Sequence, residues 1–203
     1  LSRHVGRIVA TDLSERALAF AAITAQLNRL DIDLRQGSLF GPVAGEVFDL
    51  VVSNPPFVVS PRTTSSRHTY RDSGIPGDEV SRRVLVDGAA HLAPGGYLQM
   101  LANWVHRTGE DWRDRVADWV HGTGCDAWVV QREVQDRASY VELWLRDSGE
   151  VASPDYPGAY DEWLGWFEAE GVEGVGFGWV TLRRTAGPPQ VRVEEWPHAV
   201  ELP

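Results

Sequence analysis

The stretch Phe48-Asp49-Leu50-Val51-Val52-Ser53-Asn54-Pro55-Pro56-Phe57 decides the fold of this 203-residue chain. Its first half is rich in strand-forming residues, and its second half places a polar side chain before two prolines and an aromatic ring. A central strand cannot continue through Pro55-Pro56, because each proline removes a ladder hydrogen bond and fixes φ. The chain must therefore leave the sheet at Asn54. The carboxyl end of a strand is where open α/β sheets bind their ligands.

Short strands and helices alternate on both sides of this stretch. Apolar runs indicate strands, and apolar residues at helical spacing indicate helices. The expected strands cover residues 7–12, 33–36, 48–53, 97–104, 127–134 and 177–183. The expected helices cover residues 15–30, 79–92, 110–121, 138–146 and 160–170, although the pattern of 138–146 also fits a strand. Such alternation is typical of a largely parallel α/β sheet.

Two segments lack this periodicity. Residues 58–78 are rich in Ser, Thr, Pro, Gly and Arg, and we interpret them as a long loop. Loops of this length are uncommon in compact domains unless they are lids or binding loops. Near the carboxyl end, Gly187-Pro188-Pro189 predicts a linker, and residues 191–203 are expected to form a tail that can add an edge strand.

Composition narrows the class of protein. The net charge of −10 argues against electrostatic binding of nucleic acid over a broad surface. All basic side chains apart from His are Arg, and the group at 62, 67, 71, 82 and 83 fits either a solvated loop or a phosphate contact. The single Cys125 fits a reducing cytosol, and no apolar run of eighteen residues or signal peptide indicates a membrane span or secretion. Six scattered His and one Cys give no metal-ligand spacing, so we expect no metal site.

Three candidate sites fall at the ends of predicted strands: Asp12, the turn Gly37-Ser38-Leu39, and Asn54 with the residues after it. In a parallel sheet these ends point to the same edge, so the three sites can converge on one ligand. The carboxylate of Asp12 carries only acceptors and suits the vicinal hydroxyls of a ribose. Helix capping by Asp12 explains the same spacing equally well.

Asn54 suits a planar nitrogen as a methyl acceptor. Such a nitrogen is a poor nucleophile because its lone pair is delocalised. The side-chain oxygen of Asn54 and the carbonyl oxygen of Pro55 can each accept one N–H, which holds the lone pair toward an electrophile. Phe57 can stack on a flat substrate group. A tight turn at the end of a strand is the alternative reading of these residues.

The Asn54-Pro55-Pro56-Phe57 stretch resembles the Asn/Asp-Pro-Pro-aromatic motif of class I S-adenosylmethionine-dependent methyltransferases that modify planar nitrogens. The segments 71–78 and 92–98 are similar to those of the release-factor glutamine methyltransferases within the small-domain methyltransferase group. This resemblance implies a Rossmann-like sheet, mostly parallel with a final antiparallel strand, and S-adenosylmethionine as the cofactor. It implies a protein glutamine amide or an exocyclic amino group of RNA or DNA as the acceptor.

The same resemblance assigns roles to individual residues. Asn54, Pro55 and Phe57 become catalytic candidates. The residues implied in cofactor binding are Asp12, Leu13, Ser38, Leu39 and Asn54. Those implied in substrate binding are Pro56, Arg67 and Arg71. Ser38 stands where the family often has an Asp that reaches the adenine, so backbone groups near Leu39 are expected to take over that contact.

One departure from the family concerns the segment before Arg7. The first strand and the glycine-rich loop that cradles the methionine end of the cofactor should precede it, and no such loop stands in residues 1–6. We therefore expect a partial methyltransferase domain over residues 1–184, with a core at 7–135 and an extension at 136–184, followed by the linker and tail. An upstream domain of the same chain is expected as a partner, and these 203 residues alone should bind cofactor weakly or not at all.

Two other classes of protein compete with the enzyme. A methyltransferase-like binding subunit without activity agrees with the missing loop, but it has no use for Asn54-Pro55-Pro56-Phe57. A nicotinamide-dependent oxidoreductase shares the strand-acid-helix pattern around Asp12. It too has no use for the Asn-Pro-Pro sequence, so methyl transfer is the function predicted.

Overall fold

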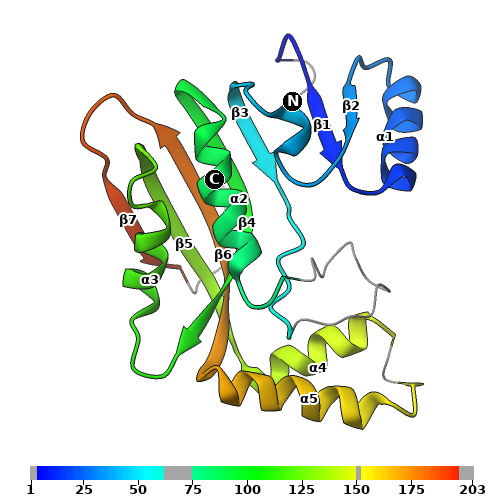
Figure 1. The fold of residues 1–203 in the computed structure, drawn as a ribbon, viewed down its shortest axis with the longest axis vertical. Helices are drawn as coiled ribbons and strands as arrows, with labels where there is room; N and C mark the ends of the chain where they lie inside the picture. Colours follow the sequence, from blue (N-terminus) through cyan, green and yellow to red (C-terminus); the bar gives the residue numbers. More distant parts are fainter. Residues whose placement is uncertain (1–3, 62–74, 150–151, 197–203) are drawn as a thin grey trace. The chain divides into compact units, whose positions relative to one another are not determined.

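A computed structural model describes residues 4–61, 75–149 and 152–196. The chain forms two compact units, Leu1–Glu46 (unit 1) and Val47–Pro203 (unit 2). Each unit carries its own sheet, with two strands in unit 1 and five in unit 2 (Figure 1). None of the helices in the described residues is long and apolar enough to cross a membrane.

Unit 1 is a strand-helix-strand unit. Strand β1 (Val9–Asp12) and strand β2 (Asp33–Gln36) pair in parallel, so that Asp12 lies opposite Gln36. Helix α1 (Glu15–Leu27) connects them, and Ser14 caps it by accepting the Ala17 N–H at 3.3 Å. The short 3-10 helix η1 (Gly41–Val43) follows β2. The crossover brings the carboxyl ends of both strands to the same edge.

The sheet of unit 2 has the order β3-β4-β6-β5-β7. Its strands are β3 (Phe48–Ser53), β4 (Leu92–Arg107), β5 (Cys125–Asp136), β6 (Val172–Arg184) and β7 (Val191–Glu195). Strands β3 and β4 are parallel, and so are β5 and β7. Strand β6 runs antiparallel to both of its neighbours. This confirms the predicted mixed sheet with a late antiparallel strand, and β7 is the predicted edge strand.

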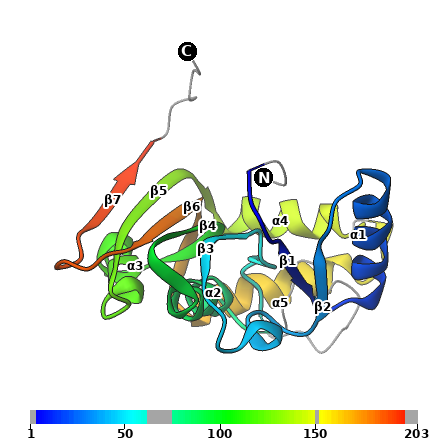
Figure 2. The same ribbon diagram turned by 90° about the horizontal axis from the view of Figure 1, so that it is seen from above.

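Two pairs of helices cover the sheet of unit 2. Helices α2 (Glu79–Ala90) and α3 (Trp112–Val120) lie on one face, whereas α4 (Arg137–Asp147) and α5 (Tyr156–Ala169) pack together at the end of the sheet where β4 finishes and β6 begins (Figures 1 and 2). The predicted helix over 138–146 is thus confirmed as α4. The hairpin of α4 and α5 is inserted between β5 and β6.

A buried ion pair fixes the start of α2. Both carboxylate oxygens of Asp78, which is 5% exposed, accept hydrogen bonds from the guanidinium of Arg115 in α3, and one of them also accepts the Val105 N–H at 2.9 Å. Burial lowers the pKa of Arg115, but the hydrogen bonds and charge of Asp78 outweigh that effect and hold the pKa above its usual value. Removing Arg115 would leave the buried carboxylate of Asp78 without a charged partner.

Strand β4 shows where the sheet is covered. Along residues 97–102 its side chains alternate between exposed and buried, as expected for a sheet with one open face. From Ala102 to Val105 every side chain is buried. The second face is therefore closed at this end, and Asn103 and Val105 are the β4 residues that turn toward it.

Strand β4 is also longer than predicted. Pro94-Gly95-Gly96, which separates the predicted helix over 79–92 from the predicted strand over 97–104, lies within β4, where the pairing with β3 shifts register between Phe48 and Leu50. A side chain at position 96 would place its Cβ 2.8 Å from the backbone oxygen of Phe48, so only glycine fits there. The turn residues thus form a bulge in the strand because the two backbones approach closely.

Candidate active site

Asn54 stands directly after β3, whose last ladder residue Ser53 lies opposite Met100. Asn54 is exposed, and within the described part of the chain its amide makes no hydrogen bond. Pro55, by contrast, is buried. A rigid, anchored proline thus follows a polar side chain that is free to bind a ligand.

The residues after the two prolines are held inside unit 2. Phe57 is half-buried, and residues 58–61 are buried. The rings of Phe57 and Trp144 meet almost at a right angle, with centroids 6.5 Å apart and an interplanar angle of 72°. The Val59 N–H donates to the hydroxyl of Tyr140 at 2.8 Å. The first part of the predicted loop is therefore a fixed wall, and the stretch from 62 to 74, with Arg67 and Arg71, lies outside the described residues.

The predicted cofactor residues gather at one edge of unit 1. The Gly37 N–H donates to the backbone oxygen of Asp12 at 3.0 Å, and the Thr11 hydroxyl donates to the backbone oxygen of Leu39 at 3.1 Å. These bonds join the turn after β2 to the end of β1. The structure thus brings Asp12 and the 37–39 turn together, as the parallel pairing predicts.

The two carboxylate oxygens of Asp12 have different surroundings. Its Oδ1 accepts the N–H of Ser14 at 2.7 Å, which orders the turn before α1, whereas the residue that caps α1 is Ser14 and not Asp12. In the described residues Oδ2 has no hydrogen-bond donor, and the side chain is exposed. One carboxylate oxygen is therefore available to a ligand while the other holds the turn.

The other cofactor candidates present mainly backbone and apolar groups. Ser38 is exposed, and Leu13 is 63% exposed. Leu39 has a φ of 47°, an uncommon conformation for a residue with a side chain. Such a local strain occurs often at binding sites. Convergence of these residues with Asn54 involves both units and remains a prediction.

Sequence reasoning missed Tyr140 and Trp144. Both lie in α4 and contact the segment after Phe57, although Tyr140 is 81 positions away from Val59 in the sequence. The only sequence signal is the aromatic content of the second half, which holds all nine Trp of the chain. Periodicity within α4 identifies a helix but gives no indication of its partner.

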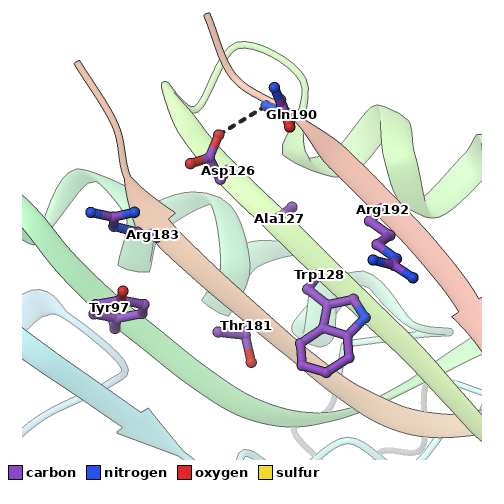
Figure 3. Close-up of a pocket in the computed structure, with 8 residues that line it drawn as sticks. All are labelled: Tyr97, Asp126, Ala127, Trp128, Thr181, Arg183, Gln190 and Arg192. Atoms are coloured by element: carbon purple, nitrogen blue, oxygen red, sulfur yellow. Dashed lines mark hydrogen bonds between the residues drawn. The ribbon is translucent and has the colours of Figure 1, made fainter. Parts of the chain in front are cut away.

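A separate hollow of about 290 Å³ lies on the open face of the five-stranded sheet. Figure 3 shows Tyr97, Thr181 and Trp128 in a row across three neighbouring strands, with Arg183 above the ring of Tyr97. A second hollow of about 340 Å³ on the same sheet reaches Leu101 and Trp179. None of the predicted site residues lines either hollow. We therefore place the candidate site at Asn54. The surface with the two hollows, which includes Val52, Tyr97, Leu101 and Thr181, is called the open sheet face below.

Comparison with known proteins identifies relatives that match about half of the chain. The chain is 38% identical over 98 residues to the release factor glutamine methyltransferase of Deinococcus radiodurans, covering 45% of this chain and 35% of that protein. It is 35% identical over 98 residues to the ribosomal protein uL3 glutamine methyltransferase of Bradyrhizobium diazoefficiens, covering 44% and 31%. A ribosomal RNA small subunit methyltransferase C of Alcanivorax borkumensis is 31% identical over 103 residues, covering 51% and 27%.

The chain thus spans about a third of the length of the curated relatives it matches. Among solved structures, the YcgJ protein of Bacillus subtilis has a TM-score of 0.52 at 12% identity, covering 92% of this chain and 86% of that one, which shows likeness of fold. The family model described as methyltransferase small domain matches residues 2–110, which include Asp12, the 37–39 turn and Asn54. The chain therefore belongs to the methyltransferase small domain family and has its α/β Rossmann-like fold.

Proposed function

We propose that the protein transfers a methyl group from S-adenosylmethionine to a planar nitrogen, and that it acts in the cytosol. The observation that carries this proposal is the state of Asn54: exposed, without a hydrogen bond in the described residues, and followed by a buried proline. If Asn54 served only to form a turn, its side chain would be expected to hydrogen-bond to the nearby backbone. This side chain is instead left for a ligand.

The chemistry of the acceptor follows from two oxygens. The Oδ1 of Asn54 and the carbonyl oxygen of Pro55 each accept one N–H of the acceptor, which fixes the plane of the nitrogen and leaves its lone pair directed at the electrophile. Pro55 has no N–H that would compete for these acceptors. The proton leaves after the nitrogen has become cationic, so no strong general base is required. Phe57 supports the flat acceptor group from the side.

The cofactor side of the site fits S-adenosylmethionine, which supplies an electrophilic methyl group when bound. The unbonded Oδ2 of Asp12 suits a ribose hydroxyl, and the turn at Ser38 and Leu39, where Ser38 is exposed, suits an adenine edge. Asp12 holds the ribose, and the 37–39 turn orients the base. The Thr11 bond to Leu39 keeps these two groups at a constant separation.

A protein glutamine amide is the proposed acceptor. The relatives from Deinococcus and Bradyrhizobium are named glutamine methyltransferases, and the net charge of −10 disfavours a polyanionic substrate. An amino group on a nucleic-acid base is the second candidate, because the Alcanivorax relative is named a ribosomal RNA methyltransferase. An upstream domain of the same chain is a proposed partner in either case.

The test of this function is Asn54→Ala in the full chain, meaning the full-length protein with its proposed upstream domain, assayed with radiolabelled S-adenosylmethionine against a glutamine-containing peptide and against RNA. Loss of one positioning hydrogen bond should lower kcat by about a hundredfold, with cofactor affinity unchanged. Unchanged turnover would contradict the mechanism.

The matched control is Asn28→Ala, which removes the other exposed asparagine of the described residues, at the end of α1. Its kcat should remain that of the wild type. Cofactor binding without transfer to either substrate would favour a methyltransferase-like binding subunit. Steep salt dependence of substrate binding would favour RNA over peptide.

A further inference from the structure

The segment after the Asn-Pro-Pro turn is anchored by a part of the chain that lies outside residues 2–110, where the family model matches. A cluster of buried side chains joins Val58 and Val59 to Tyr140 and Leu145 of α4 and to Phe167 of α5. Val59 itself is 0% exposed. The acceptor side of the site therefore rests on the α4–α5 hairpin.

Tyr140 is the centre of this anchor. Its side chain is 0% exposed, and the rings of Trp144, Trp163, Phe167 and Phe177 lie around it with centroids 5.6 to 6.5 Å away. Rings packed on several sides allow the hydroxyl little freedom to move. The position of its oxygen is therefore fixed by the hairpin and by β6.

That fixed oxygen accepts two buried N–H groups from other elements. One is the backbone N–H of Val59 at 2.8 Å, and the other is the side-chain Nδ2 of Asn103 in β4 at 3.2 Å. Asn103 is 1% exposed. A buried donor that loses its acceptor is costly, so the segment stays where the hydroxyl holds it. Val59 is two residues after Phe57 and five after Asn54, so this bond limits where both can lie.

Trp144 supplies a second constraint. It lies one helical turn after Tyr140 in α4, with its ring 6.0 Å from that of Tyr140 and 6.5 Å from that of Phe57. The edge contact restricts the orientation of the Phe57 ring. Two successive turns of α4 thus contact the segment with the substrate-side residues. Tyr140 bonds the backbone of Val59, and Trp144 contacts the ring of Phe57.

We propose that the α4–α5 hairpin positions the acceptor side of the site, with Tyr140 as a positioning residue acting through Val59, and Trp144 acting through Phe57. This inference rests on the proposed function. It assigns the positioning of the acceptor to the α4–α5 hairpin, which lies outside residues 2–110, where the family model matches.

The test compares Tyr140→Phe with Tyr160→Phe in the full chain. Tyr160 is half-buried in the same cluster, on α5, and its hydroxyl makes no hydrogen bond in the described residues, so the control makes the same chemical change without losing the contact. Amide exchange at Asn54 and at residues 57–60, the non-proline positions of this segment, should quicken in Tyr140→Phe while the β4–β6 ladder stays protected. In the same variant kcat/KM for the acceptor should fall about ten- to a hundredfold, with the affinity for S-adenosylmethionine unchanged.

A second variant, Trp144→Leu, should raise KM for the acceptor more than it lowers kcat, because it releases the Phe57 ring and leaves the Val59 bond in place. Unchanged exchange at Asn54 and at residues 57–60 in Tyr140→Phe, or the same kcat/KM as in Tyr160→Phe, would overturn the inference. If the wild type transferred no methyl group to any acceptor, the proposed function would fail, and the exchange at Val59 would then decide the positioning contact by itself.

Discussion

The carboxylate of Asp12 uses one oxygen inside the protein and leaves the other to a ligand. The bond from the Ser14 N–H to Oδ1 orients the side chain before any cofactor arrives. A preorganised acceptor loses less freedom on binding than one that must be ordered. The turn contact of Asp12 with Ser14 is therefore compatible with the proposed ribose contact.

Asp12→Asn should weaken S-adenosylmethionine binding by about tenfold, because a neutral amide oxygen is a poorer acceptor than a carboxylate and one oxygen is replaced by a donor. The turn should survive, since the amide retains an acceptor for Ser14. Isothermal titration calorimetry on the full chain measures the change. Asp31→Asn, an exposed acid of the same unit without a hydrogen bond in the described residues, should leave the affinity unchanged. Equal affinities of the two variants would contradict the role of Asp12.

At the scale of single residues, the sequence predicted the positions of those residues whose placement follows from local context. Asp12 and Asn54 each stand at the end of an apolar run, which alone places them at the edge of a sheet. Tyr140 has no such local signature, because its role depends on a hydrogen bond across 81 positions. Arg67 and Arg71 remain predictions.

Helices and strands could be predicted where the signals for them lie in the local sequence. Helix α4 begins at a capping residue, since the carboxylate of Asp136 accepts the N–H groups of Ala138 and Ser139 at 2.9 and 3.1 Å. That cap is visible in the sequence, and it decides the ambiguous 138–146 segment in favour of a helix. The extent of β4 was not visible, because the continuation of the strand depends on its pairing with β3 and β6 across distant parts of the chain.

Helix α2 carries an acid-sensitive contact at its first residue. Hydrogen bonds from Arg82, and then from Arg83, lower the pKa of Glu79 from 4.5 to about 2. A carboxylate with a lowered pKa in the folded state stabilises the protein above the unfolded pKa, and this stabilisation is lost as the pH falls from 4.5 toward 2.

Glu79→Gln should therefore lower the free energy of unfolding by up to about 1 kcal/mol at pH 7 and by nothing near pH 2. Urea denaturation across this range gives the difference. Glu162→Gln is the control, because Glu162 is exposed on α5 and has no ion pair in the described residues, so its effect should be small at every pH. A constant difference between wild type and Glu79→Gln down to pH 2 would show that the arginine contacts do not form.

At the scale of the whole molecule, the two units have very different cores. Ala25 and Val43 are the buried hydrophobic residues of unit 1 in the described range, whereas the rest of the buried apolar side chains belong to unit 2. A unit of this size with so small a core is marginally stable. The proposed cofactor residues Asp12, Ser38 and Leu39 thus stand on the less stable part of the chain.

Amide protons of β1, α1 and β2 should exchange with solvent faster than those of the β4–β6 ladder at neutral pH, because local opening costs less where little apolar surface is buried. Hydrogen exchange followed by mass spectrometry measures both regions in one experiment. In the full chain with its proposed upstream domain, saturating S-adenosylmethionine should slow exchange in unit 1, since a ligand stabilises the state that binds it. Equal protection of both units without ligand would refute this view of the two cores.

The open sheet face of unit 2 carries exposed apolar side chains, and burying them would increase the free energy of unfolding of unit 2. Val52, Tyr97 and Leu101 are 59%, 43% and 47% exposed on this sheet. Each square ångström of such surface removed from water is worth about 25 cal/mol. A chain segment or a protein laid over this face would therefore raise the melting temperature of unit 2, by an amount that grows with the concentration of the covering molecule.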